Sequence, residues 1–196
     1  ATPPTQTSGA SSVSLTGAVF TWLRSGGTIS FGGGVLKAFD TVDYSNRFST
    51  ADNQQYSIDT NSQNITWATS LVSLGGSLTK TGSGTLTLSA ANTYSGGTTI
   101  NFGTVRVSVS SIGGPSPTAI TSGGLGTGDV SVASGATLDI YGGIFTISNN
   151  VSVSGIGTSA TVGALTNSYS NSYVGTFSGA INLVGATAIG GTGALS

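Results

Sequence analysis

Apolar residues alternate with Ser and Thr in short runs that are bounded by Gly. Leu86 and Leu88 form one such pair, and Val105 and Val107 form another. This period of two is typical of strands with one buried and one solvated face. The sequence therefore favours β-structure over helix along most of its length.

Helix signals are nearly absent from the chain. The only candidate, residues 35–39, is too short to be stable as an isolated helix in water. We expect another strand there, with Leu36 and Ala38 on one face and Val35 and Lys37 on the other. The chain is predicted to be all-β, with less than about one tenth helix.

Pairs of Gly predict regularly spaced turns. The pairs begin at positions 26, 75, 96, 113, 123 and 142. Turns at this spacing fit an array of coils, and the inward residues are mostly Val, Leu, Ile and Ala, which suit stacking in a narrow cylinder. The pattern indicates a β-solenoid. Its predicted stacked core comprises Leu78, Leu86, Leu88, Ile100, Val105, Val107, Leu138 and Ile140.

The chain divides into three zones. Residues 1–16 are expected to form a flexible polar arm or linker, and residues 17–74 irregular first coils with an aromatic cluster. Residues 75–196 are expected to form regular coils. Since solenoids need polar caps to stay soluble, the uncapped pattern at the end of the sequence suggests continuation into another coil or another molecule.

The ends of the predicted solenoid are candidates for contact. The stretch 181–196 has no charged residue and no Pro, which are the residues that commonly prevent an end strand from pairing with another strand. Val13 and Leu15 begin an alternating strand in the N-terminal arm. We expect them to meet the coil that contains Ala188 and Ala194, either in a neighbouring copy or in the next cassette of a longer chain.

Charge and composition exclude several classes of function. Only 6% of the residues are charged, and the five basic residues are scattered, which argues against nucleic acid as a partner. No apolar run approaches the roughly 20 residues that span a bilayer, so this segment is not expected to insert into a membrane. Cys, His and Met are absent. Catalytic triads with His or Cys, disulfides and most transition-metal sites are thereby excluded, and no catalytic, cofactor or metal residue is assigned.

Four acidic residues lie close together in the sequence: Asp40, Asp43, Asp52 and Asp59. Three roles remain open for them. Two carboxylates could serve a glycosidase, oxygen ligands could bind calcium, and Asp side chains commonly cap turns. The spacing matches neither an EF-hand nor a calcium β-roll, and turn capping is favoured.

Aromatic residues concentrate in the second zone. Trp22, Trp67, Tyr44, Phe48 and Tyr56 could form a platform for stacking sugars, or they could fill the first coils. In a chain so poor in large side chains, core packing is the favoured interpretation.

A specific motif begins at Gly75. The sequence GGSLTKTGSGTLTL starts there, NTYSGGTTI starts at Asn92, and GTV starts at Gly103. Residues 75–105 thus resemble the autotransporter-associated β-strand repeat, with conservative departures at Ala90-Ala91 and at Val105.

The resemblance implies a right-handed parallel β-helix displayed outside a bacterial cell, normally within a much longer polypeptide. The favoured function is non-catalytic: a structural or adhesive solenoid at the cell surface, with surface glycans or a host surface as candidate partners. Two alternatives remain, a subunit of an extracellular fibre joined end to end, and a carbohydrate-active enzyme on a β-helix.

Overall fold

A computed structural model of the chain describes most of the sequence. The described ranges are 13–15, 19–20, 27–108, 124–141, 146–159, 161–169 and 174–196, the first two for their backbone only. Most of the predicted N-terminal arm, and Trp22, lie outside the described residues. Within these ranges the regular structure is strand, apart from one short 3-10 turn at Ser45–Arg47 (η1). The prediction of an all-β chain is confirmed.

Two long sheets run along the stack of coils. In spatial order, the eight-stranded sheet contains Val19–Phe20 (β2), Val35–Lys37 (β4), Gln55–Asp59 (β5), Ser77–Thr81 (β7), Thr98–Ile100 (β9), Val130–Val132 (β11), Val151–Gly155 (β14) and Ile181–Thr187 (β17). The six-stranded sheet contains Ile65–Trp67 (β6), Thr85–Leu88 (β8), Gly103–Val107 (β10), Ala136–Ile140 (β12), Leu165–Asn167 (β15) and Ile189–Gly191 (β18).

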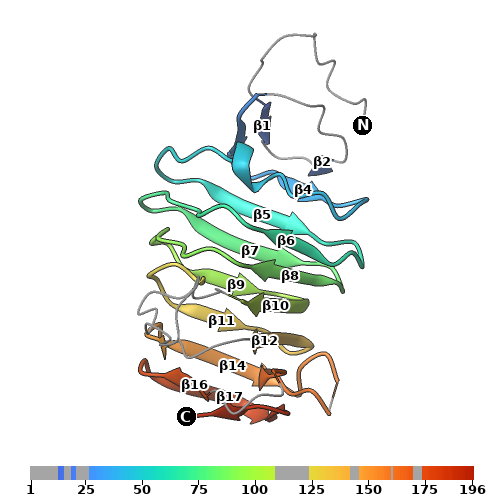
Figure 1. The fold of residues 1–196 in the computed structure, drawn as a ribbon, viewed down its shortest axis with the longest axis vertical. Helices are drawn as coiled ribbons and strands as arrows, with labels where there is room; N and C mark the ends of the chain where they lie inside the picture. Colours follow the sequence, from blue (N-terminus) through green and yellow to red (C-terminus); the bar gives the residue numbers. More distant parts are fainter. Residues whose placement is uncertain are drawn as a thin grey trace, which may run out of the picture.

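Shorter sheets lie at the two ends of the third side. Val13–Leu15 (β1) pairs with Ile29–Phe31 (β3), and a three-stranded sheet joins Thr146–Ile147 (β13), Val174–Phe177 (β16) and Ala194–Leu195 (β19). Every strand pair in the described part is parallel. Figure 1 shows the coils stacked along the long axis, with β1 and β17 towards opposite ends. The chain is a parallel β-solenoid.

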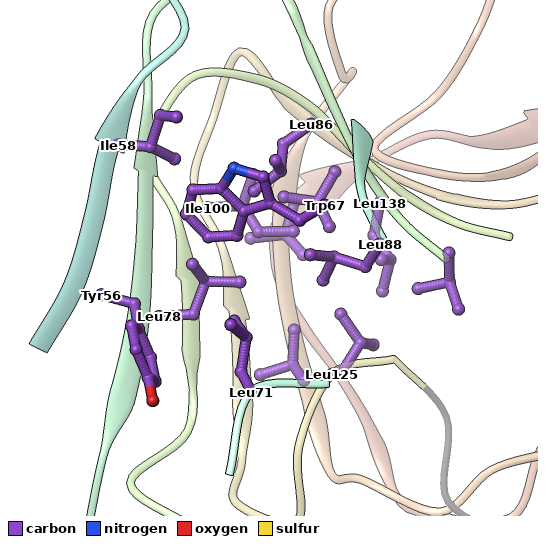
Figure 2. Packing of buried hydrophobic residues seen from close by; sticks show 14 of the residues in the cluster. Tyr56, Ile58, Trp67, Leu71, Leu78, Leu86, Leu88, Ile100, Leu125 and Leu138 are labelled. Carbon is purple, nitrogen blue, oxygen red and sulfur yellow. The ribbon is translucent and has the colours of Figure 1, made fainter. Parts of the chain in front are cut away.

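The register stacks apolar residues directly on one another between coils. In the six-stranded sheet, Leu86 pairs with Val105, and Val105 pairs with Leu138. A second inward row joins Leu88 to Val107 in the same way. All eight residues of the predicted core are fully buried, and Figure 2 shows several of them packed between the two sheets. Each coil therefore relies on its neighbours to cover its apolar face.

The short segment at residues 35–39 follows its predicted alternation. β4 spans Val35–Lys37, and Leu36 and Ala38 are buried whereas Lys37 is partly exposed. After β4 the chain leaves the regular path and returns through η1, so the first described coils are less regular than those that follow.

Candidate functional site

The four clustered Asp residues are spread over the first coils, with Asp40 and Asp43 in the loop after β4. Asp43 caps two backbone groups, because its carboxylate accepts hydrogen bonds from the amides of Ser45 at 2.8 Å and Ala68 at 2.9 Å. Asp40 accepts a hydrogen bond from the amide of Val42. These contacts are typical of Asp side chains that stabilise turns.

The other two Asp residues are also placed at turns. Asp59 accepts a hydrogen bond from the amide of Asn61 and lies 3.5 Å from the Lys37 ammonium group, while Asp52 sits in an exposed turn. Within the described ranges, no three acidic, His or Cys side chains gather closely enough to hold a metal ion.

The aromatic residues of the first coils form an internal stack. Phe48 packs edge-on against Trp67 with ring centroids 4.9 Å apart, and Tyr56 packs edge-on against Tyr94 at 6.2 Å. Trp67, Tyr56 and Tyr94 are almost fully buried. Burial raises the pKa of Tyr56 to about 12. These rings fill the core and offer no open face to a sugar; Tyr44 lies beside them, partly buried.

A small cavity opens beside this aromatic stack. Its volume is about 30 Å³, and its lining includes Phe39, Asp40 and Val42 from the loop after β4 together with Trp67. A cavity of this size has room for ordered water, and its lining is mostly apolar.

Lys80 is a buried cation inside the solenoid. Its position in β7 is inward, between Ile58 and Ile100 in the neighbouring strands. The ammonium group donates hydrogen bonds to Thr60 Oγ1 and to three backbone carbonyls, those of Thr81, Gly82 and Phe102. Burial lowers its pKa to about 8, although the Asp59 carboxylate opposes the shift. The alternation with Leu78 in the sequence already indicates an inward position for Lys80, which is missing from the predicted core.

Asn side chains satisfy backbone groups on the third side of the solenoid. Buried Asn92 accepts a hydrogen bond from the amide of Leu71 in the preceding coil and donates one to the carbonyl of Gly124 in the following coil. Asn149 donates to the carbonyls of Gly126 and Gly128 in the same manner. Polar side chains thus hold consecutive coils together in the described part of the third side between its two short sheets.

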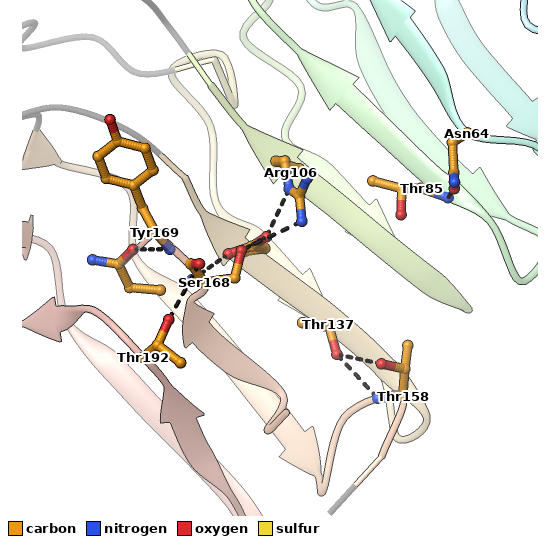
Figure 3. Close-up of polar contacts among 10 residues, drawn as sticks. Asn64, Thr85, Arg106, Thr137, Thr158, Ser168, Tyr169 and Thr192 are labelled. Carbon is orange, nitrogen blue, oxygen red and sulfur yellow. Dashed lines mark hydrogen bonds and ion pairs between the residues drawn. The ribbon is translucent and has the colours of Figure 1, made fainter. Parts of the chain in front are cut away.

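An ion pair on the outer face of the six-stranded sheet was not foreseen. Arg106 Nε lies 2.8 Å from Asp139 Oδ2, and the guanidinium carbon of Arg106 lies 4.4 Å from the centroid of the Tyr141 ring. Figure 3 shows Arg106 joined by dashed lines to neighbouring polar groups, with Ser168 and Tyr169 close by. The two charged residues are 33 positions apart in the sequence, so only the strand register reveals that they are neighbours.

The last coil exposes part of its inward row. Ile181 and Leu183 in β17 pair with Val151 and Val153, yet their exposed fractions are 39% and 52% because no further coil of the described chain covers them. Ala188 is partly buried and Ala194 is exposed; of Val13 and Leu15, the structure describes the backbone of β1 alone.

A comparison with protein families gives one match. Residues 78–107 match the family model described as passenger-associated-transport-repeat. No curated protein and no solved structure matches the chain. The part of the chain that the structure describes has no helix with the length and apolar character needed to cross a bilayer. The resemblance to the autotransporter passenger repeat is therefore confirmed over residues 78–107.

Proposed function

We propose that the chain is a non-catalytic structural and adhesive segment of a solenoid displayed at a bacterial surface. The main support is the unbroken stacking of inward residues, which runs in register from Ile65 through Leu86, Val105 and Leu138 to Leu165. A continuous core of this kind makes a stiff rod whose stability is shared among coils. The passenger repeat agrees with export and surface exposure.

The outer face of the eight-stranded sheet supports the adhesive part of the proposal. One outward row carries a hydroxyl or amide group on each of six successive strands. In spatial order it contains Ser57, Thr79, Thr99, Ser131, Ser152 and Asn182. The row is uncharged, and its groups repeat at the roughly 4.8 Å spacing of paired strands. Such a face can form many weak hydrogen bonds with a polar surface at once.

The adhesive role can be tested with beads that carry the purified chain. We expect the beads to attach to bacterial or host cell surfaces, and attachment to fall at least fivefold for the double variant Thr99→Asp and Ser131→Asp, which places two charges in the outward row. Thr66→Asp, an exposed change on the six-stranded sheet, is the matched control and should attach normally. Equal attachment by the two variants would reject this face as the adhesive surface.

End-to-end assembly into a fibre is the second candidate, and the exposed inward row of the last coil favours it. Leu183 and Ile189 are 52% and 53% exposed although both continue core rows, and residues 140–196 contain no charge that would oppose stacking. An end-to-end contact between copies would be heterologous, so it would propagate into a filament rather than close into a dimer.

Light scattering at increasing protein concentration tests this second candidate. We expect the average mass of the wild-type chain to rise, and we expect the rise to disappear after deletion of residues 1–16 or introduction of Asp at Ala188 and Ala194. Ile156→Asp is the control, because Ile156 is 52% exposed, as Leu183 is, but lies in a lateral loop. A wild-type chain that stays monomeric at high concentration would refute end-to-end assembly.

A further inference from the structure

The Arg106–Asp139 pair interrupts a neutral row on the outer face of the six-stranded sheet. Across consecutive strands, Thr66 pairs with Thr87, Thr87 with Arg106, and Arg106 with Asp139. The fold tolerates Thr at this position in the earlier coils. Stacking of the coils therefore does not by itself require a charged pair here.

The Asp139 carboxylate is fully engaged with its neighbours. It accepts hydrogen bonds from Arg106 Nε at 2.8 Å, from the Ser168 amide at 3.0 Å and from Ser168 Oγ at 2.7 Å, and its side chain is only 3% exposed. It therefore orients the guanidinium and is not itself available to a ligand.

Some N–H groups of the Arg106 guanidinium remain able to bind a ligand. Besides Nε, Arg106 Nη2 donates to Ser168 Oγ at 3.3 Å, while Nη1 has no hydrogen-bond partner among the described residues. The side chain is 34% exposed, and its guanidinium carbon lies over the Tyr141 ring, 4.4 Å from the ring centroid. A guanidinium fixed in this way can form two parallel hydrogen bonds with a carboxylate.

Two aromatic rings lie beside Arg106, and one of them appears where the earlier coils have small residues. The amides of Ser89, Ser108 and Tyr141 make equivalent hydrogen bonds to the preceding coil, so Tyr141 occupies the place of these Ser residues. The Tyr169 ring packs edge-on against Tyr141 with centroids 5.0 Å apart, and both are partly exposed. Aromatic rings with polar tips provide the apolar surface and the hydroxyls that pyranose rings contact.

We propose that Arg106, Tyr141 and Tyr169 form a binding site for a carboxylate-bearing saccharide such as a uronate residue of an acidic polysaccharide. Arg106 binds the carboxylate, and the Tyr side chains contact the sugar ring and its hydroxyls. Asp139 and Ser168 act as positioning residues. The inference rests on the proposed adhesive role, because it names the class of partner that the surface would contact.

Calorimetric titration of the purified chain with tetragalacturonate tests the site, with the fully methyl-esterified tetrasaccharide and hexa-aspartate as comparison ligands. We expect tetragalacturonate to bind with a dissociation constant below about 1 mM, and the ester and the peptide to bind at least tenfold more weakly. Arg106→Gln should weaken binding at least tenfold. Because that variant leaves Asp139 without its cation, the double variant Arg106→Gln and Asp139→Asn provides a neutral pair of similar shape and should show the same loss.

Arg47→Gln is the matched control, since Arg47 also lies over a Tyr ring, that of Tyr44, but with its centre 5.8 Å away. Its binding of tetragalacturonate should equal that of the wild type. The proposal is overturned if tetragalacturonate does not bind, if hexa-aspartate binds equally well, or if a folded Arg106 variant binds normally. Bead attachment is measured separately, so loss of saccharide binding alone would leave the proposed surface role intact.

Discussion

The ammonium group of Lys80 donates a hydrogen bond of 2.9 Å to the backbone carbonyl of Phe102, one coil further along the solenoid. The same group reaches back to Thr60 Oγ1 in the preceding coil at 3.1 Å. A single buried cation thus ties three consecutive coils together at one corner. Buried carbonyl groups that lose such a donor carry the full cost of desolvation.

Replacement of Lys80 by Met is expected to lower the free energy of unfolding by about 3 kcal/mol, because three backbone carbonyls at partly buried positions lose their donor. Urea denaturation followed by circular dichroism measures the change. Lys37→Met is the matched control: Lys37 is partly exposed, and its ion pair with Asp59 should contribute less than about 1 kcal/mol. Equal stability of the wild type and the Lys80 variant would contradict the inferred role.

The free energy of unfolding should rise with pH above pH 8. Burial lowers the pKa of Lys80 from 10.5 to about 8, so between these values the unfolded chain binds a proton that the folded chain has released. Stability then increases by about 1 kcal/mol per pH unit over that window. The measurement is urea denaturation at pH 7 to 9.5, with Lys80→Met as the reference.

The pH series stops at 9.5 to avoid the ionisation of Tyr56 in the unfolded chain. Burial raises the pKa of Tyr56 above its usual value of 10, so above that pH the unfolded chain loses the Tyr56 proton first and stability falls. Within the chosen window, a difference between wild type and Lys80→Met that does not change with pH would exclude the titration of Lys80 as its cause.

The regular rows of the solenoid could be read from the sequence, because strict alternation fixes which residues share a face. Leu86 and Leu88 are separated by one residue, so no knowledge of distant pairing was needed to place both inward. The spacing between stacked residues, by contrast, varies: Leu86 pairs with Val105, but Val105 pairs with Leu138 much further along. Coils of unequal length hide lateral neighbours such as Arg106 and Asp139.

The first coils also contain contacts that alternation in the sequence does not predict. Asp43 was correctly favoured as a turn-capping residue, since its contact with the amide of Ser45 is local. Its second contact, with the amide of Ala68, joins positions 25 residues apart and depends on the irregular path through η1. Long-range contacts of this kind follow from the stacking geometry, which alternation alone does not determine.

The inward position of Leu88 gives a sharp stability test. Leu88→Asp should lower the free energy of unfolding by about 4 kcal/mol, because it places an unpaired charge in the apolar row between Trp67 and Val107. Thr87→Asp is the matched control on the outward face of the same strand and should cost less than about 1 kcal/mol. Similar melting temperatures and protease resistance for both variants would show that the assigned faces are wrong.

Asn92 is expected to be as important for stability as an apolar core residue. Its side chain is 1% exposed and serves the amide of Leu71 and the carbonyl of Gly124, which belong to the coils on either side. Asn92→Ala leaves both backbone groups unpaired, and we expect a loss of about 3 kcal/mol in the free energy of unfolding. Asn150→Ala is the control, because Asn150 is exposed and water can replace its hydrogen bonds.

Asn92→Asp separates the two halves of this role, because Asp keeps the acceptor for Leu71 but cannot donate to Gly124 when ionised. The carboxylate would instead face the Gly124 carbonyl in the interior, so at pH 7 we expect Asn92→Asp to be at least as unstable as Asn92→Ala. Protonation at pH 4 restores one donor and should recover part of the loss relative to Asn92→Ala. Denaturation curves at both pH values measure the difference, and an Asp variant as stable as the wild type at pH 7 would show that the Gly124 carbonyl does not depend on Asn92.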